Sequence, residues 1–266
     1  MDFKKITEVL VTAKAVQYVM IAVLLIGAFF LPRLAVKQET EAARQEATAE
    51  VQQLKDSQQS GGNEQAAKGT IVLDPGHGGD DPGMIGAGGI NEKKLNLIYA
   101  KKLQALLEAE GYRVVLTRET EKGLYDVDAA HKKAQDMQRR VAIIAEEAPL
   151  ITVSIHQNSY QDPAVSGPQV FYYEHSAEGQ KLAKSIQDRM NSELSEARSR
   201  VEKSNSSYYI LKRSQGTTVI VECGFLSNPE EEARLQEEAY QDRVCAAVCK
   251  GILQYLDEDS DESKIS

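Results

Sequence analysis

The segment TIVLDPGHGG at residues 70–79 decides the fold of this chain. Its first four residues are apolar or β-branched, and Asp74-Pro75-Gly76 follows at once. This combination predicts a short buried strand that ends in a turn. After a glycine-rich loop, apolar residues recur at helical spacing between Asn91 and Glu110, and Gly111 ends the pattern. The first two elements are therefore a strand and a helix joined by a long loop.

The same alternation of strands and helices continues along the chain. Further strands are predicted at 112–117, 150–155, 169–173, 208–211 and 217–222, and further helices at 131–148, 176–198 and 229–256. Strands separated by helices of this length predict an α/β three-layer sandwich, in which a largely parallel central sheet of about six strands carries helices on both faces. In such sheets, ligands bind beyond the carboxyl ends of the strands.

Three of the predicted strands lead into reactive side chains. His77 follows the first strand, His156 ends the third and Glu222 ends the sixth. If these strands are parallel neighbours, the three side chains converge on one edge of the sheet, and the loop carries Glu92 back over that edge. Two histidines and a glutamate can hold a catalytic Zn²⁺, and a further carboxylate can transfer the proton. The pattern alone leaves a metal site and structural histidines equally open.

Other chemistry is less well supported by the pattern. The glycine-rich loop at residues 76–89 lacks the dinucleotide and P-loop glycine spacings, and Asp80 and Asp81 would repel phosphate, so nucleotide binding is disfavoured. Ser154 has no nucleophile-elbow motif around it. Cys223 is predicted to face the core, on the side of its strand opposite the preceding glutamate. Neither is therefore favoured as a nucleophile.

The amino-terminal part of the chain is predicted to attach the domain to a membrane. Residues 15–31, AVQYVMIAVLLIGAFFL, are uncharged and follow several lysines, and as a helix they would extend roughly 25 Å. Residues 1–34 are thus predicted to be a retained anchor, with the rest of the chain on the extracytoplasmic side. A cleaved signal peptide, and hence secretion, is the alternative. The segments predicted to follow are a Gln/Glu/Ala-rich linker at 35–68, a folded domain at 69–257 and an acidic disordered tail at 258–266.

Composition limits the classes of function. The length of 266 residues suits one globular domain with additional segments. The formal net charge of −9 argues against nucleic acid as a partner, because binding it requires basic residues that neutralise phosphates. Three irregularly spaced cysteines do not form a disulfide framework.

Four motifs in this order resemble those of the zinc-dependent N-acetylmuramoyl-L-alanine amidases of bacterial cell walls. They are Leu73-Asp74-Pro75-Gly76-His77-Gly78-Gly79, Glu92, Ser154-Ile155-His156-x-Asn158 and Glu222-x-Gly224-Phe225-Leu226-Ser227-Asn228. The resemblance covers about residues 69–256. It implies that His77, Glu92 and His156 bind Zn²⁺ and that Glu222 is the catalytic glutamate. Gln157 and Ser159 depart from the more usual His-Ala-Asn-Ala form of the third motif, but neither stands at a ligand position.

The resemblance also implies a reaction and a substrate. The enzyme would hydrolyse the amide between the lactyl group of N-acetylmuramic acid and the L-Ala of the peptidoglycan stem peptide. Glu222 would deprotonate the attacking water and then protonate the leaving amine. Two alternatives stay open: a non-catalytic peptidoglycan-binding module with the same fold, and a zinc peptidase or deacetylase of another class.

Within this family, the chain resembles the germination-specific amidases of spore-forming bacteria most. It shares with them a single amino-terminal apolar segment, the absence of wall-binding repeats, Phe171-Tyr172-Tyr173, and the ending Lys250-Gly251-Ile252-Leu253-x-Tyr255. That resemblance implies action on the spore cortex, on the forespore side of the membrane, where muramic-δ-lactam forms with the help of a downstream deacetylase. It also implies an activating lipoprotein as a partner, which some members require.

Overall fold

The computed structural model describes residues 67–265. The predicted anchor at residues 15–31 lies outside the described residues, and so does almost all of the predicted linker at 35–68. Among the helices of the described part, none is both long and apolar enough to cross a membrane.

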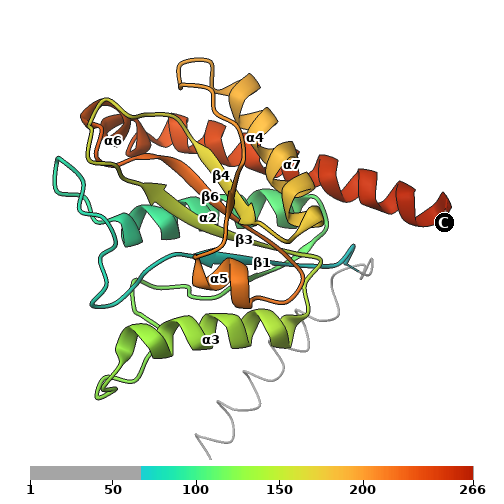
Figure 1. Cartoon of the computed structure of the whole chain (residues 1–266), viewed down its shortest axis with the longest axis horizontal. Helices are drawn as coiled ribbons and strands as arrows, with labels where there is room; N and C mark the ends of the chain where they lie inside the picture. The colour runs from blue at the N-terminus through green and yellow to red at the C-terminus, as the bar shows by residue number, and fades with distance from the viewer. Residues whose placement is uncertain (1–66, 266) are drawn as a thin grey trace, which may run out of the picture. The chain divides into compact units, whose positions relative to one another are not determined.

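Six strands form one sheet, in the order β2-β1-β3-β6-β4-β5 (Figure 1). Their bounds are β1 Thr70–Pro75, β2 Arg113–Leu116, β3 Ile151–Asn158, β4 Gln169–Tyr173, β5 Lys203–Asn205 and β6 Thr217–Phe225. Strands β2, β1, β3 and β6 pair in parallel, whereas β4 pairs antiparallel with β6 and parallel with β5. No helix lies between β3 and β4, and a return to a parallel path needs a long crossover connection, which is usually a helix. The predicted six-stranded, largely parallel sheet is confirmed.

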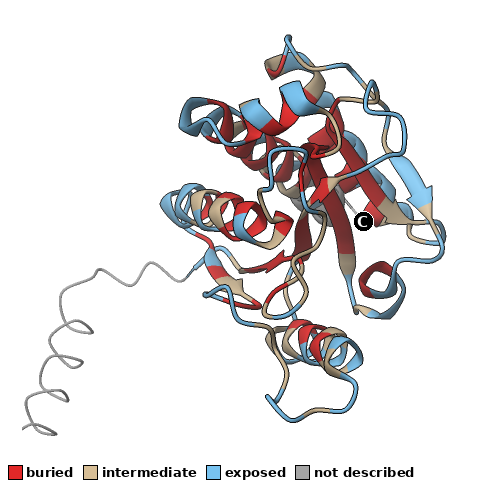
Figure 2. Ribbon diagram, turned by 90° about the vertical axis from the view of Figure 1, so that its left-hand side faces the viewer, coloured by how far each residue is buried: buried red, intermediate tan, exposed pale blue. Residues whose placement is uncertain are grey.

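Helices cover both faces of this sheet. Helices α2 (Glu92–Ala109), α4 (Ala177–Glu193) and α7 (Glu238–Ile265) pack with the larger cluster of buried apolar side chains. Helices α3 (Lys132–Glu147) and α5 (Tyr209–Arg213) pack with a smaller cluster on the opposite face. Along β6, Val219 and Val221 belong to the first cluster and Ile220 to the second, as strand alternation requires. Figure 2 shows the buried residues concentrated in the strands and on the helix surfaces that face them.

The predicted strand at 208–211 is wrong, because this segment forms the short helix α5. The side-chain oxygen of Asn205 accepts hydrogen bonds from the backbone N–H groups of Ser207, at 2.7 Å, and Tyr208, at 2.8 Å. These bonds turn the chain away from the edge strand β5 and into the helix. Ile210 and Leu211 then pack against the smaller cluster. A run of four apolar residues fits a strand and a helical turn equally well, so the pattern could not distinguish them.

The carboxyl-terminal helices also differ from the prediction. Helix α4 ends at Glu193 rather than near 198, and the final predicted helix is two helices, α6 (Pro229–Leu235) and α7. Residues 258–266 were predicted to form a disordered tail, but α7 continues to Ile265. No glycine or proline follows Gly251 to end that helix, and Gln254 donates a hydrogen bond of 3.0 Å to Glu258 one turn later.

Candidate metal centre

The sheet topology brings the predicted site residues to one edge. β1 and β6 are the two parallel neighbours of β3, and within the β3–β6 pair His156 lies opposite Glu222. His77 follows the end of β1, and Glu92 is the first residue of α2. The predicted convergence of these four residues is therefore found in the structure.

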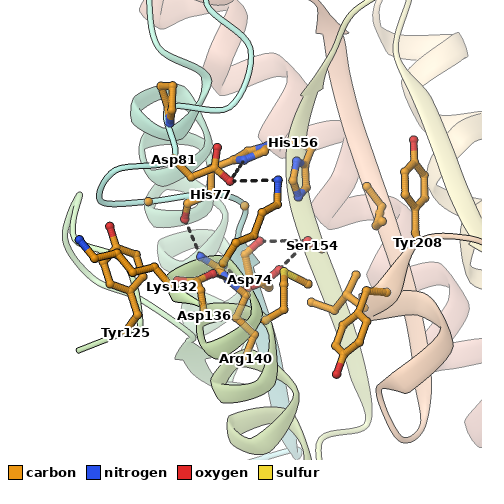
Figure 3. A pocket seen from close by; sticks show the side chains of 18 of the residues that line it. Asp74, His77, Asp81, Tyr125, Lys132, Asp136, Arg140, Ser154, His156 and Tyr208 are labelled. Carbon is orange, nitrogen blue, oxygen red and sulfur yellow. Dashed lines mark hydrogen bonds and ion pairs between the residues drawn. The ribbon is translucent and has the colours of Figure 1, made fainter. Parts of the chain in front are cut away.

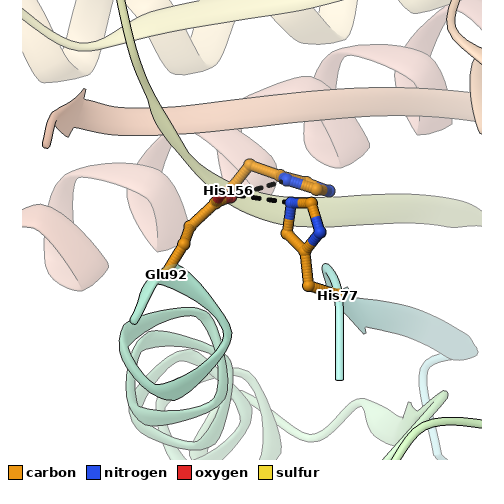
Figure 4. A group of neighbouring side chains, drawn as sticks. All are labelled: His77, Glu92 and His156. Carbon is orange, nitrogen blue, oxygen red and sulfur yellow. Dashed lines mark hydrogen bonds and ion pairs between the residues drawn. The ribbon is translucent and has the colours of Figure 1, made fainter. Parts of the chain in front are cut away.

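The carboxylate of Glu92 contacts both imidazoles, which lie next to each other (Figure 4). Its Oε1 is 2.9 Å from Nδ1 of His156, and its Oε2 is 3.1 Å from Nε2 of His77. One ligand atom from each residue can be chosen so that all three lie within 4.8 Å of one another. Two imidazole nitrogens and a carboxylate oxygen, contributed by three separate elements, are a donor set that fits Zn²⁺.

Glu92 is held rigidly by groups other than the histidines. The backbone N–H of Met84 donates to its Oε2 at 2.8 Å, and the backbone N–H of Gln157 donates to its Oε1 at 3.1 Å. The side chain of Asn96 adds a bond of 3.2 Å to Oε1. Burial by itself would raise the pKa of Glu92, but the hydrogen bonds with His156 and His77 outweigh burial and hold that pKa well below its usual range. The side chain of Glu92 is therefore an ionised carboxylate held in one position.

The loop that carries His77 is conformationally demanding. His77 has a φ of 62°, a left-handed conformation that is costly for a residue other than glycine and is found mainly at functional sites. At Gly76 a Cβ atom would lie 2.1 Å from the ring of His156, so only glycine lets the loop pass beneath that ring. Arg118 holds the loop by donating to the carbonyls of Pro75 and Gly76, each at 2.8 Å.

A buried ion pair between Asp74 and Arg140 also holds the loop that carries His77. Nη1 of Arg140 lies 2.6 Å from Oδ1 of Asp74, and both side chains are almost fully buried. Asp74 also accepts from Ser154 Oγ and Thr117 Oγ1, each at 2.6 Å, and Arg140 donates to the carbonyl of His77. Burial would raise the pKa of Asp74, but the guanidinium and the hydroxyl donors lower it below its usual range. The loop conformation thus rests on a fully bonded charged pair.

Sequence reasoning gave no role to this supporting shell. Asp74 belongs to the first of the four motifs, Arg118 directly follows a predicted strand, and Arg140 lies within a predicted helix. Their partners are up to 66 positions apart in the chain, so only the folded structure shows the pairing.

Glu222 differs from Glu92 in its environment. It is 7% exposed, and its Oε2 has no hydrogen-bond partner among the residues the structure describes. Burial, together with the charge of Glu92, raises the pKa of Glu222 to about 7, although the two histidines oppose this rise. A carboxyl that titrates near neutral pH can both accept and return a proton.

The two alternative nucleophiles are not available to a substrate. Ser154 is fully buried and donates its hydroxyl hydrogen bond to Asp74. Cys223 is 1% exposed within the larger apolar cluster, where burial raises the pKa of its thiol well above the usual value. Its predicted position in the core is confirmed.

A pocket of about 470 Å³ opens beside the three residues His77, His156 and Glu222. It extends between α3 and α5, where Lys132, Lys133, Met137, Tyr208 and Tyr209 line it. Figure 3 shows Lys132 and Tyr125 on one side of the pocket and Tyr208 on the other. A substrate can therefore reach the histidine–carboxylate group along a cleft that contains aromatic and cationic side chains.

Comparison with known proteins places this geometry in a family. The family described as N-acetylmuramoyl-L-alanine amidase matches residues 71–254. The chain is 37% identical over 194 residues to the germination-specific N-acetylmuramoyl-L-alanine amidase of Bacillus subtilis, covering 72% of this chain and 81% of that protein. It is 31% identical over 189 residues to the amidase LytC of the same organism, covering 70% of this chain but 35% of LytC.

Solved structures are similar over the same region. The CwlD amidase from Clostridioides difficile, determined in complex with the GerS lipoprotein, matches with a TM-score of 0.69 and 34% identity over 71% of this chain and 98% of that one. The amidase AmiC2 of Nostoc punctiforme matches with a TM-score of 0.62 and 33% identity over 71% of this chain and 97% of that one.

Proposed function

The chain belongs to the N-acetylmuramoyl-L-alanine amidase family, and from that premise we propose that it is a zinc-dependent hydrolase of peptidoglycan. The bond cleaved is the amide between the lactyl group of N-acetylmuramic acid and the L-Ala of the stem peptide. Zn²⁺ is held by His77, Glu92 and His156. The observation that carries this proposal is the contact of an ionised carboxylate with two adjacent imidazoles, with a second, buried carboxyl facing the same pocket.

Each residue has a distinct part in the proposed reaction. Bound Zn²⁺ supplies the Lewis acidity that polarises an amide carbonyl and favours negative charge on its oxygen. Glu222 takes a proton from the attacking water and returns it to the amine that leaves. Burial raises its pKa to about 7 in the metal-free protein, and the charge of bound Zn²⁺ would lower that value, so Glu222 would be ionised and able to accept a proton at neutral pH. Arg118 and Arg140 keep the His77 loop in place, so the ligands need not rearrange when substrate binds.

The test is to incubate the purified protein, loaded with Zn²⁺, with peptidoglycan and to analyse the products by mass spectrometry. Free stem peptides that begin with L-Ala are expected. Glu222→Gln should keep its metal and lose at least about 100-fold in turnover, because the proton carrier is removed. Glu146→Gln, on the exposed side of α3, is the matched control and should match wild type.

The products also distinguish the alternatives. New amino termini within the peptide would indicate a peptidase, and free acetate would indicate a deacetylase. A protein that binds Zn²⁺ and peptidoglycan but releases nothing, even with an added lipoprotein partner, would favour the non-catalytic wall-binding module.

We also propose that the enzyme acts on the spore cortex, outside the membrane to which residues 15–31 anchor it. The support is the similarity to the germination-specific amidase of B. subtilis and the apolar amino-terminal segment. An activating lipoprotein partner is proposed because the CwlD amidase was solved with the GerS lipoprotein. Spores of a strain that lacks this chain should contain no muramic-δ-lactam, the product whose formation requires removal of stem peptides. Normal amounts of muramic-δ-lactam would contradict the cortex role.

A further inference from the structure

The two nitrogens of the His77 ring face different carboxylates. Nε2 is directed at Glu92, as described above, and Nδ1 lies 3.0 Å from Oδ2 of Asp81. A neutral imidazole carries one N–H donor and one lone pair, so only one nitrogen can bind a metal while the other donates. The group that accepts from Nδ1 therefore determines which nitrogen is free.

Asp81 is itself held in one position by its loop. Its other carboxylate oxygen, Oδ1, accepts from the backbone N–H of Gly83 at 3.0 Å. Its backbone exchanges two hydrogen bonds with Gly78, of 3.1 Å and 3.2 Å. One hydrogen bond thus holds the carboxylate and two hold the backbone of Asp81, and Nζ of Lys133 lies 3.6 Å from Oδ2, the oxygen that faces His77. Figure 3 shows the Asp81 side chain directed toward His77 at the rim of the pocket.

The ring of His77 is positioned by contacts of its two nitrogens, with Glu92 and with Asp81. Arg140 holds the carbonyl of His77, but that contact leaves rotation of the ring about its side-chain bonds unrestrained. The bond between Nδ1 and Asp81 restrains this rotation.

We propose that Asp81 is a positioning residue for the metal centre. By accepting a hydrogen bond from Nδ1–H of His77, it selects the tautomer whose Nε2 lone pair is directed at Zn²⁺, and so tightens metal binding. This inference rests on the proposed zinc-dependent function and names a residue beyond the ligand set. Carboxylates that accept from the second nitrogen of a metal-bound histidine commonly contribute 10- to 100-fold in metal affinity.

The simpler alternative is that Asp81 only shapes its turn through Gly83. The two roles use different oxygens, so a single substitution separates them. In Asp81→Asn, Oδ1 can still accept from Gly83, while the amide group now placed against Nδ1 can only donate to it. That favours the opposite tautomer of His77, with the proton on Nε2, the nitrogen the metal needs.

The neighbouring residue provides a matched control. Asp80 is exposed and pairs with Lys132 at 2.7 Å rather than with a histidine. Asp80→Asn removes the same charge one position away in the same loop. Competition with a chromogenic chelator, using the full-length protein, should show that Asp81→Asn weakens Zn²⁺ affinity about 10- to 100-fold. Asp80→Asn should stay within about twofold of wild type.

Two further measurements separate positioning from folding. The urea midpoint of the metal-free protein should fall no further for Asp81→Asn than for Asp80→Asn, whereas a merely structural role would lower it further and leave zinc affinity unchanged. In the Zn²⁺-loaded wild-type protein, long-range ¹H–¹⁵N NMR of the imidazoles should show His77 with its proton on Nδ1 and the metal on Nε2. This second measurement does not depend on whether a variant folds.

Several results would overturn the proposal. Equal zinc affinity for wild type, Asp81→Asn and Asp80→Asn would remove the positioning role, and so would a Zn²⁺-loaded wild-type His77 that binds the metal through Nδ1. If wild type itself binds no Zn²⁺, the proposed metal centre fails as a whole, which is a separate result from an intact centre that is indifferent to Asp81.

Discussion

Glu222→Gln should stabilise the metal-free protein at pH 8 while leaving its stability at pH 4.5 almost unchanged. Glu222 is buried, its Oε2 has no hydrogen-bond partner in the described part of the chain, and its ionised form lies near the charge of Glu92. Glutamine has nearly the same shape but never carries the charge. The substitution therefore removes a cost that the native residue imposes on the folded state only when it is deprotonated.

The size of this effect follows from linkage between proton binding and folding. The pKa of Glu222 rises from 4.5 to about 7 on folding, so the folded state binds the proton more tightly than the unfolded state. The stability that this proton contributes is fully present below about pH 4.5, declines as pH rises, and is lost above about pH 7. A difference of about 2.5 in pKa, at about 1.4 kcal/mol each, corresponds to about 3 kcal/mol.

The assay is urea unfolding of wild type and Glu222→Gln with EDTA at pH 4.5 and at pH 8. The variant should gain about 3 kcal/mol relative to wild type at pH 8 and little at pH 4.5. Comparing the two proteins at each pH cancels the titration of shared groups that do not interact with Glu222, whereas His156, whose pKa the charge of Glu222 raises, contributes to the measured difference. A variant that is less stable than wild type at pH 8, or an identical difference at both pH values, would refute the reasoning.

Three further predictions concern the ion pair of Asp74 and Arg140, the loop that carries His77, and the candidate metal ligands. Arg140→Met should lower the free energy of unfolding by about 3–5 kcal/mol in urea denaturation, because it leaves Asp74 buried without its ion-pair partner; a loss below about 1 kcal/mol would contradict this. Gly76→Ala should weaken zinc affinity roughly tenfold or more in chelator competition, since its Cβ would displace the His156 ring; unchanged affinity would show that the loop yields easily. Zn²⁺ at about 100 times its dissociation constant should stabilise wild type by about 2.7 kcal/mol in thermal unfolding, an effect that Glu92→Ala should abolish.

The sequence alone indicated five of the six strands and the positions of two of the three candidate ligands. Strand signals directly before His77 and at His156 and Glu222 place all three at carboxyl ends of strands, and parallel neighbouring strands bring such ends to one edge. Glu92 carried no comparable signal, because a glutamate at a helix start is ordinarily a favourable charge for the helix dipole. Only the order of the motifs suggested it as a ligand.

Only the tertiary structure shows which residues hold the site residues in place at that edge and set their pKa values. The pair of Asp74 and Arg140 and the contact of Asp81 with His77 depend on how loops and helices lie over the strand ends. The raised pKa of Glu222 depends on burial by neighbours that are distant in the chain. Strand periodicity is local and can be recognised in a dozen residues, whereas burial and long-range charge pairing exist only once the chain has folded. The residues that can do the chemistry were therefore visible in the sequence, and the environment that sets their protonation and position was not.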